Sequence, residues 1–233
     1  DGTGYDLIGL LVGSEGTLAV TTSVRLRLWP RLTSRAVALL AFDSTESAVA
    51  VLPALRASLP SLSAAEMFYA PGLALVRKHR GLPAPFAVEH QAYLLLECVD
   101  RTDPLDALAA VVESMTGVVD ATVATDAAGQ RALWAYRESH TESISAEGIP
   151  IKLDVSVPVA SLPSLIDALG PTIAAVSPAA RPIIFGHVNE GNLHVNVLDA
   201  LDQHDPVTSA VLSLVASMNG AISSEHGVGR AKV

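Results

Sequence analysis

Two histidines, His187 and His194, flank a turn and could bind one metal ion between them. Apolar, β-branched runs stand on both sides of the sequence Asn-Glu-Gly-Asn, and Gly and Asn favour tight turns because they tolerate positive φ. The pattern predicts an antiparallel hairpin centred on Glu190 and Gly191, in which His187 faces His194 and Asn196 points to the same side. The two histidine Cβ atoms would be about 5 Å apart. Two neutral imidazoles at that separation can share a transition metal.

A hydrogen-bonded or solvent-facing histidine pair is the alternative to a metal site, and a further ligand would decide between them. Glu225 and His226 lie near the end of the sequence, in the run Ser-Glu-His-Gly-Val-Gly. Small residues and glycines allow the backbone to approach a ligand closely. Glu225 is therefore a candidate third ligand.

Two cationic side chains could hold a carboxylate. Arg137 and Thr141 are four residues apart on a helix expected over 126–144, so they share a face, and a guanidinium beside a hydroxyl suits a carboxylate clamp. Lys152 lies on the polar side of an alternating strand expected over 151–157. The alternatives are a solvated arginine and a solvent-facing ion pair, which contributes little to stability.

A glycine-rich turn, Gly13-Ser-Glu-Gly-Thr17, stands near the start of the sequence. Its backbone N–H groups could cradle a phosphate, although most such turns are only turns. Residues 20–28 follow it, where Val and Leu alternate with Thr, Ser and Arg. This alternation predicts a half-buried strand.

The rest of the sequence alternates between strand and helix patterns. Strands are expected at 35–42, 62–69, 91–99, 118–123 and 151–157, and in the hairpin over 183–197. Helices are expected at 43–59, 71–79, 103–115, 126–144, 161–169 and 205–219. This order predicts an α+β fold, an antiparallel sheet with helices on one face. A boundary is expected near residue 31, where the first alternating pattern ends.

Composition limits the class of protein. The sequence has 233 residues, half of them hydrophobic and 17% charged, which is enough for a sizeable core. The formal net charge of −9 argues against a nucleic-acid partner. No apolar run reaches the roughly 18 residues that span a bilayer. The single cysteine, Cys98, cannot form an internal disulfide, which fits a reducing, cytoplasmic compartment. Because no Met begins the sequence, we expect a piece of a longer protein.

Four segments together resemble a known enzyme family. They lie at 3–17, 152–158, 186–196 and 224–230, and the last two are the most specific. Their order and spacing are similar to those of FAD-dependent 2-hydroxy-acid dehydrogenases of the vanillyl-alcohol-oxidase superfamily. That group includes D-lactate dehydrogenases, the flavin subunit of glycolate oxidase and D-2-hydroxyglutarate dehydrogenase. The resemblance implies the tail of an α+β FAD-binding domain at 1–31 and a ferredoxin-like substrate (cap) domain at 32–233, truncated at its C-terminus.

The resemblance also implies roles for individual residues. The metal-binding residues of the family match His187, His194 and Glu225, and the ion would be Zn²⁺, Mn²⁺ or Fe²⁺. The histidine proposed as general base matches His226. Residues that hold the substrate match Arg137, Thr141, Lys152 and Asn196. The stretch that closes over the FAD pyrophosphate matches Gly13, Glu15, Gly16 and Thr17, and Asn192 is assigned to the cofactor with them.

The expected reaction is oxidation of a small anionic D-2-hydroxy acid (lactate, 2-hydroxyglutarate or glycolate) to the 2-oxo acid, with hydride transfer to FAD. The expected electron acceptor is a quinone, an electron-transfer flavoprotein or a cytochrome. A homodimer and a peripheral location at the inner membrane are compatible with this family. Two alternatives are a non-catalytic metal-binding fragment and a flavin-independent zinc hydrolase. The turn differs from the family pattern, because Asn189-Glu190 replaces the usual Gly-Asp. Ala19 and Ser223 also stand where Gly is common.

Overall fold

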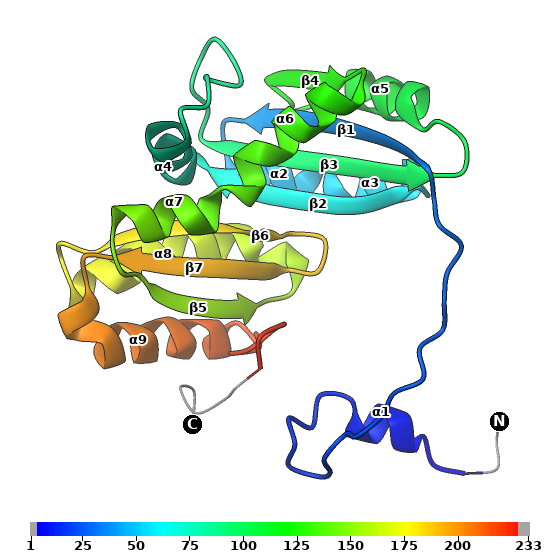
Figure 1. Ribbon diagram of the computed structural model, residues 1–233. Coiled ribbons are helices and arrows are strands. Elements are labelled where there is room, and N and C mark those ends of the chain that lie inside the picture. The colour runs from blue at the N-terminus through cyan, green and yellow to red at the C-terminus, as the bar shows by residue number, and fades with distance from the viewer. Residues whose placement is uncertain (1–3, 228–233) are drawn as a thin grey trace.

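A seven-stranded antiparallel sheet organises the computed structural model, which describes residues 4–227 (Figure 1). The order across the sheet is β4-β1-β3-β2-β6-β7-β5. The strands are β1 Ser34–Phe42, β2 Leu62–Tyr69, β3 Ala92–Asp100, β4 Asp120–Ala124, β5 Ile151–Ser156, β6 Arg181–His187 and β7 Asn192–Leu198. The predicted α+β class and antiparallel sheet are confirmed.

The helices alternate with the strands along the chain. They are α1 Leu7–Leu11, α2 Thr45–Ala50, α3 Leu52–Ser58, α4 Ala70–Arg80, α5 Leu105–Ser114, α6 Ala127–Glu138, α7 His140–Glu147, α8 Leu162–Val176 and α9 His204–Ser217, with 3₁₀ turns η1 Val159–Ser161 and η2 Leu201–Gln203. Two predicted helices are interrupted. The helix expected over 43–59 divides at Val51, and the helix expected over 126–144 divides at Ser139.

The strand order contains a ferredoxin-like unit, as the resemblance implied. Strands β1 to β4 lie in the order β4-β1-β3-β2, with α2 and α3 after β1 and α5 before β4. The segment β5-α8-β6-β7-α9 repeats this arrangement and joins the first unit through β2 and β6. An isolated bridge between Ser156 and Ala221 occupies the place of its fourth strand. The repetition is topological, and the sequence does not reveal it.

Helices cover both faces of the sheet. The larger core cluster lies under α2, α3, α5, α8 and α9, and a smaller cluster lies under α4, α6 and α7. Because successive side chains of a strand point to opposite faces, the seven consecutive buried residues from Ala36 to Phe42 contribute to both clusters. The expectation of helices on one face therefore describes only the larger layer.

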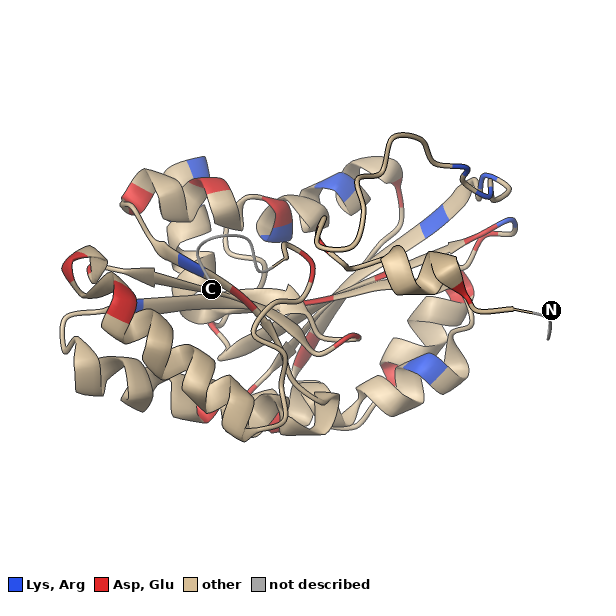
Figure 2. Cartoon of the chain, turned by 90° about the horizontal axis from the view of Figure 1, so that it is seen from below, with Lys and Arg blue, Asp and Glu red and all other residues tan. Residues whose placement is uncertain are grey.

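Figure 2 shows acidic and basic residues interspersed over the helices. Two ion pairs, Lys78–Glu147 and Arg80–Glu142, link α4 to α7.

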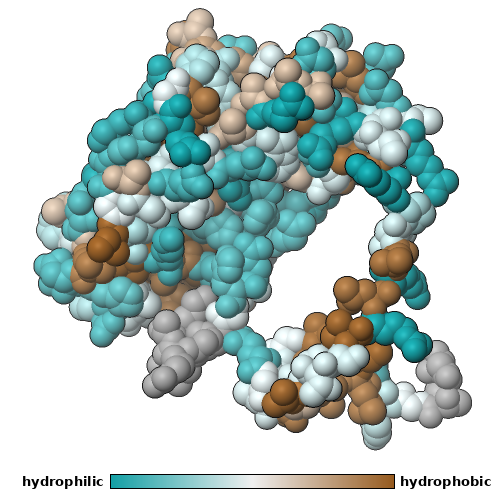
Figure 3. Space-filling view, in the orientation of Figure 1, coloured by the Kyte–Doolittle hydropathy of each residue, from teal (hydrophilic) through white to brown (hydrophobic). Residues whose placement is uncertain are grey.

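The strand predicted at residues 20–28 is not formed, and residues 18–33 contain no strand. Leu28 and Trp29 are 89% and 82% exposed. Figure 3 shows hydrophobic side chains gathered on this N-terminal segment. Alternating apolar and polar residues are typical of a strand that buries one face, but a strand also needs a neighbouring strand with which it forms hydrogen bonds. Within the described residues, this segment has no neighbouring strand.

One described segment, Val159–Val176, is long and apolar enough to cross a membrane by length and composition alone. It comprises η1 and α8. The side chains that α8 buries in the larger core cluster are Leu162, Leu165, Leu169 and Ile173. Core helices pass the same test, so the segment is weak evidence for a membrane span.

A buried histidine in the smaller cluster predicts acid sensitivity. The His140 ring packs between Phe68 and Phe185, and its Nδ1 donates to the Tyr136 carbonyl at 2.8 Å. Burial, together with the Arg137 charge, lowers the pKa of His140 to about 4. In the unfolded chain this group takes up a proton below about pH 6.5.

Stability should therefore fall as the pH drops from about 6.5 to about 4, by up to about 3 kcal/mol from this group. Denaturant unfolding of the wild type and of His140→Gln across this range measures the effect. The variant should show a weaker pH dependence even if its stability at pH 7 is lower. Equal slopes for the two proteins would show that His140 does not titrate on unfolding.

Candidate metal centre and substrate face

The candidate site lies on the smaller-cluster face of the sheet, over β6, β7 and β5. On β7, Leu193, Val195 and Val197 are buried in the larger core cluster. The residues between them therefore point to the opposite face. In the same way, Lys152 and Asp154 on β5 point away from that cluster. The strand alternation alone brings these polar side chains to one surface.

The hairpin forms, but its register differs from the predicted one by two residues. Phe185, not His187, pairs with His194, and residues 188–191 form a four-residue turn. His187 pairs instead with Glu66 on β2. A two-residue shift preserves the face of every side chain because strands have a period of two. The histidines consequently remain together, with 3.4 Å between their Nε2 atoms.

Two glycines make this turn possible. A Cβ atom at Gly186 would collide with the backbone of Asn192, and one at Gly191 would collide with the Val157 carbonyl. Gly191 also has φ +71°, a conformation that favours glycine. From outside the site, Arg56 on α3 donates from Nε to the Asn189 side chain at 2.9 Å and from its terminal nitrogen to the Asn189 carbonyl. The turn between the histidines is thus packed against Val157 at Gly191 and bound by Arg56 at Asn189.

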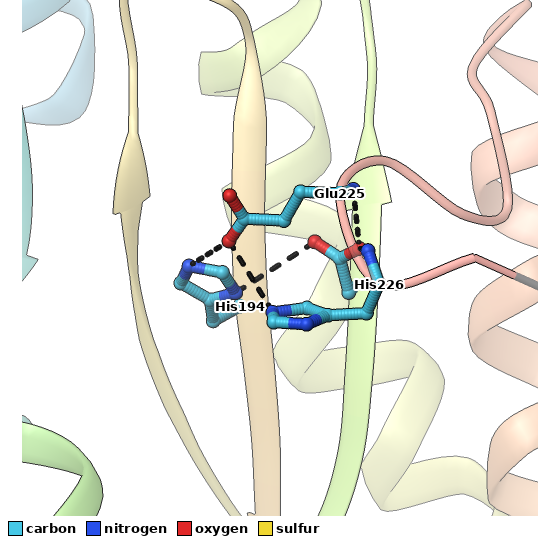
Figure 4. Close-up of side chains that lie close together, drawn as sticks. His194, Glu225 and His226 are labelled. Carbon is cyan, nitrogen blue, oxygen red and sulfur yellow. Dashed lines mark hydrogen bonds and ion pairs between the residues drawn. The ribbon is translucent and has the colours of Figure 1, made fainter. Parts of the chain in front are cut away.

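One donor atom each from His187, His194 and Glu225 forms a small triangle, and Figure 4 shows how His194 and Glu225 lie beside His226. Glu225 Oε1 lies 3.5 Å from His187 Nε2 and 3.2 Å from His194 Nε2, and the two Nε2 atoms are 3.4 Å apart. Ligands about 2.1 Å from a tetrahedral Zn²⁺ would be about 3.4 Å from one another. The donor set therefore fits one transition-metal ion. His226 Nε2 lies 3.3 Å from the same Glu225 oxygen.

Asp154 fixes the loop that carries Glu225 and His226. Its Oδ2 accepts the backbone N–H groups of Ser224, Glu225 and His226 at 3.1, 2.8 and 3.0 Å, and its Oδ1 accepts the Asn192 side chain at 2.9 Å. Burial would raise the pKa of Asp154, but these hydrogen bonds lower it to about 2. The carboxylate is therefore ionised and stabilises the loop against the sheet.

A second ligand set is geometrically available. Asp154, His194, Glu225 and His226 each place one donor atom within 4.8 Å of the others. The two oxygens of Asp154 already accept four hydrogen bonds. A metal at Asp154 would compete with the contacts that hold the loop, so the triangle through His187 fits an ion better.

Glu66 on β2 is buried, and it accepts hydrogen bonds from two residues of the site. Its Oε1 accepts from His187 Nδ1 at 2.6 Å, and its Oε2 accepts from Arg137 Nε at 2.7 Å. The Arg137 guanidinium lies 4.5 Å above the centre of the Phe185 ring. The hydrogen bond that His187 donates to Glu66 raises the pKa of His187, whereas burial lowers the pKa of His194.

The other predicted substrate residues are placed less closely together. Asn196 is buried on the site face and pairs in register with Lys152, which is exposed. Thr141 is exposed on α7, beyond the break at Ser139, so one continuous helix does not align it with Arg137. Asn192 donates to Asp154, which holds the loop that carries Glu225.

The glycine-rich turn is formed as predicted. Gly13, Glu15 and Gly16 have φ +80°, +49° and +78°. Thr17 N donates to the Ser14 carbonyl at 2.9 Å. A Cβ built on Gly227 would lie 2.9 Å from a Glu15 carboxylate oxygen, so the turn reaches the loop that carries Glu225. Thr3 and residues 228–230 of the resembling segments lie outside the described residues.

The site also has a cavity of about 320 Å³. Its lining residues are His187, Glu190, Asn192, Ser224 and Glu225.

The sequence patterns did not identify Glu66, Asp154 or Arg56 as part of the site. Their partners lie between 38 and 133 residues away along the chain, so no local pattern indicates the contacts.

Comparison with known proteins places this arrangement in a family. Residues 31–233 match the family described as FAD linked oxidases, C-terminal domain. "D-2-hydroxyglutarate dehydrogenase, mitochondrial" of Bos taurus is 35% identical over 245 residues, which cover 98% of this chain and 43% of the relative. D-2-hydroxyglutarate dehydrogenase of Xanthomonas citri pv. viticola is 35% identical over 242 residues, covering 99% and 51%. The chain spans about half the length of these relatives.

A solved structure has the same fold. An alkyldihydroxyacetonephosphate synthase superposes with a TM-score of 0.60 at 14% identity, over 97% of this chain and 47% of that one. At this identity the likeness concerns the fold alone. The family match over residues 31–233 shows that the chain belongs to the FAD-linked oxidases and contains their C-terminal domain.

Proposed function

We propose that this chain forms the substrate side of an FAD-linked D-2-hydroxy-acid dehydrogenase, with D-2-hydroxyglutarate as the substrate. The main support is the convergence of His187, His194 and Glu225 beside Arg137, in a chain whose relatives carry the name D-2-hydroxyglutarate dehydrogenase. A two-carboxylate substrate suits a site face with two cations, Arg137 and Lys152. Lactate and glycolate would use only one of them.

A divalent metal would be held by His187, His194 and Glu225. When bound, the metal would acidify the substrate hydroxyl and FAD would accept the hydride from C2. His187 suits this role because its Nδ1 donates to Glu66, which leaves the Nε2 lone pair facing the other two ligands. Burial favours the neutral form of His194, and a neutral imidazole is the form that binds metal.

The remaining residues would bind the substrate and move a proton. His226, which is exposed beside Glu225, would take the hydroxyl proton as general base. Arg137 and Lys152 would orient the carboxylates, with Asn196 as a further substrate contact. Thr141 stays a proposed contact only, because its helix is broken before it.

The FAD side is proposed for the N-terminal segment. Gly13, Glu15 and Gly16, which precede Thr17, have left-handed backbone conformations, and turns that contain such residues can present backbone N–H groups to a pyrophosphate. Its position against Gly227 puts that turn next to the proposed base. The exposed apolar side chains of residues 18–32 would pack on the rest of an FAD-binding domain. Residues 1–31 are therefore proposed as the tail of that domain, and 32–233 as the substrate domain.

Several finer predictions stay open to test. The electron acceptor is proposed to be a quinone, an electron-transfer flavoprotein or a cytochrome. The cytoplasmic location is also a proposal, and some relatives are named as mitochondrial. The alternative that residues 1–233 alone form a non-catalytic metal-binding fragment stays a prediction. Membership of the FAD-linked oxidases favours the dehydrogenase over a zinc hydrolase.

Anaerobic reduction of the purified full-length protein tests the proposal. D-2-hydroxyglutarate should bleach the flavin absorbance within seconds, and D-lactate and glycolate should act more slowly. L-2-hydroxyglutarate is the matched control and should leave the flavin oxidised. A flavin that no D-2-hydroxy acid reduces would contradict the proposed substrate class.

A further inference from the structure

We propose that Glu66 is a positioning residue that couples the metal site to the substrate-binding arginine through one carboxylate. The inference rests on the proposed function and extends it to a residue on a different strand. Each oxygen of Glu66 has a separate partner, His187 Nδ1 at 2.6 Å and Arg137 Nε at 2.7 Å. Both contacts are short and charge-assisted, the stronger class of hydrogen bond.

The position of Glu66 is set by the sheet. It pairs in register with His187 across the β2–β6 boundary, and its neighbours Ala65 and Met67 are buried in the larger core cluster. The Glu66 side chain is only 7% exposed. A carboxylate fixed in this way cannot follow either partner, so each partner is oriented relative to the other.

The contact with His187 sets its tautomer. Because Nδ1 donates its proton to Glu66, the Nε2 atom presents its lone pair to His194 and Glu225. Carboxylate–histidine pairs of this kind orient metal ligands and raise their basicity. Without the acceptor, the imidazole could rotate or carry its proton on Nε2, and a metal would lose one ligand.

The contact with Arg137 sets the direction of the guanidinium. Glu66 accepts from Nε, so the terminal nitrogens keep N–H donors for another anion. Phe185 supports the guanidinium from below at 4.5 Å, but a ring face does not fix rotation within its plane. Glu66 supplies that constraint, and the substrate carboxylate would therefore be held at a defined place relative to the metal.

The test compares Glu66→Gln with a matched control, Glu97→Gln, in the full-length protein. Glu66→Gln preserves shape but replaces one of the two accepting oxygens with an NH₂ donor. Glu97 is also a partly buried carboxylate that accepts from α6, through Trp134 Nε1 at 2.8 Å, and it pairs with Arg35 at 3.2 Å. Its loss perturbs the same helix without touching the site.

The measurements are Mn²⁺ affinity of the metal-free protein by calorimetry, and kcat and KM for D-2-hydroxyglutarate. Glu66→Gln should weaken Mn²⁺ binding about 10- to 100-fold and raise KM about tenfold or more. Glu97→Gln should change both by less than about twofold. In an Arg137→Ala background, Glu66→Gln should raise KM no further but should still weaken Mn²⁺ binding, because Arg137 is the route to the substrate.

Two results would overturn the inference. If Glu66→Gln binds Mn²⁺ as tightly as the wild type, or behaves like Glu97→Gln, Glu66 does not position the site. If the wild type binds no divalent metal, the inference fails together with the metal assignment. Bleaching of the flavin by D-2-hydroxyglutarate would then show separately whether the dehydrogenase proposal survives.

Discussion

Full-length protein carrying His194→Ala is expected to lose its divalent metal and most of its turnover. His194 Nε2 contributes to two edges of the donor triangle, 3.4 Å from His187 and 3.2 Å from Glu225. Its removal leaves two ligands, fewer than a catalytic metal site normally needs. We expect metal content below about a tenth of the wild type and kcat/KM lower by at least about 100-fold.

Metal analysis and steady-state kinetics of the same preparation check this result. The control is His204→Ala, an exposed histidine on α9 whose Nδ1 lies 2.9 Å from Asp205. It should keep the metal and the rate. Normal metal content and turnover in His194→Ala would show that the triangle is not the metal centre.

The second large effect is expected for Asp154→Asn, which should release the loop that carries Glu225 and His226. Three backbone N–H groups converge on Oδ2, and the Asn192 side chain donates to Oδ1. In Asp154→Asn, the NH₂ group replaces either Oδ1 or Oδ2, and in both cases it faces N–H donors instead of accepting from them. Breaking a buried, ionised network of this kind costs about 3 kcal/mol.

Hydrogen exchange locates that effect. The amides of Ser224, Glu225 and His226 should be protected in the wild type and should exchange at least about tenfold faster in Asp154→Asn. Metal affinity should fall with them, because Glu225 loses its fixed position. Asp167→Asn, at an exposed acid on α8, is the control and should leave the loop protected. Unchanged exchange in Asp154→Asn would show that other contacts hold the loop.

The pH dependence of this loop has a definite sign. The folded pKa of Asp154, about 2, lies below its ordinary value of 3.8. The ionised carboxylate therefore stabilises the fold at pH values above about 4, and this stabilisation is lost as the pH falls toward 2. In Asp154→Asn, this part of the acid dependence should disappear.

The faces of the strands and the β6–β7 hairpin could be predicted from sequence, but the other strand pairings could not. The hairpin forms two residues out of the predicted register, and His187 and His194 still meet because a two-residue shift keeps every side chain on its face. Glu66 and Asp154 complete the site from β2 and β5. Nothing in their local sequence specifies which distant residue they contact, since sheet order depends on non-local pairing.

Local patterns also failed where tertiary context was missing or broke a helix. Residues 20–28 alternate like a strand, yet no neighbouring strand accepts them in the described part of the chain. The helix over 126–144 reads as continuous, but it divides at Ser139, just before the buried ring of His140. As a result, Arg137 faces the site while Thr141 faces solvent.

We propose that one metal ion binds between the hairpin and the Glu225 loop. Anomalous diffraction from crystals of the full-length protein loaded with Zn²⁺ tests it most directly. We predict a single strong peak about 2.0–2.2 Å from His187 Nε2, His194 Nε2 and a Glu225 oxygen. A peak that is not within bonding distance of His187 would show that the metal binds elsewhere. Crystals that have no peak but whose flavin is still reduced by D-2-hydroxyglutarate would show that the enzyme needs no metal at this site.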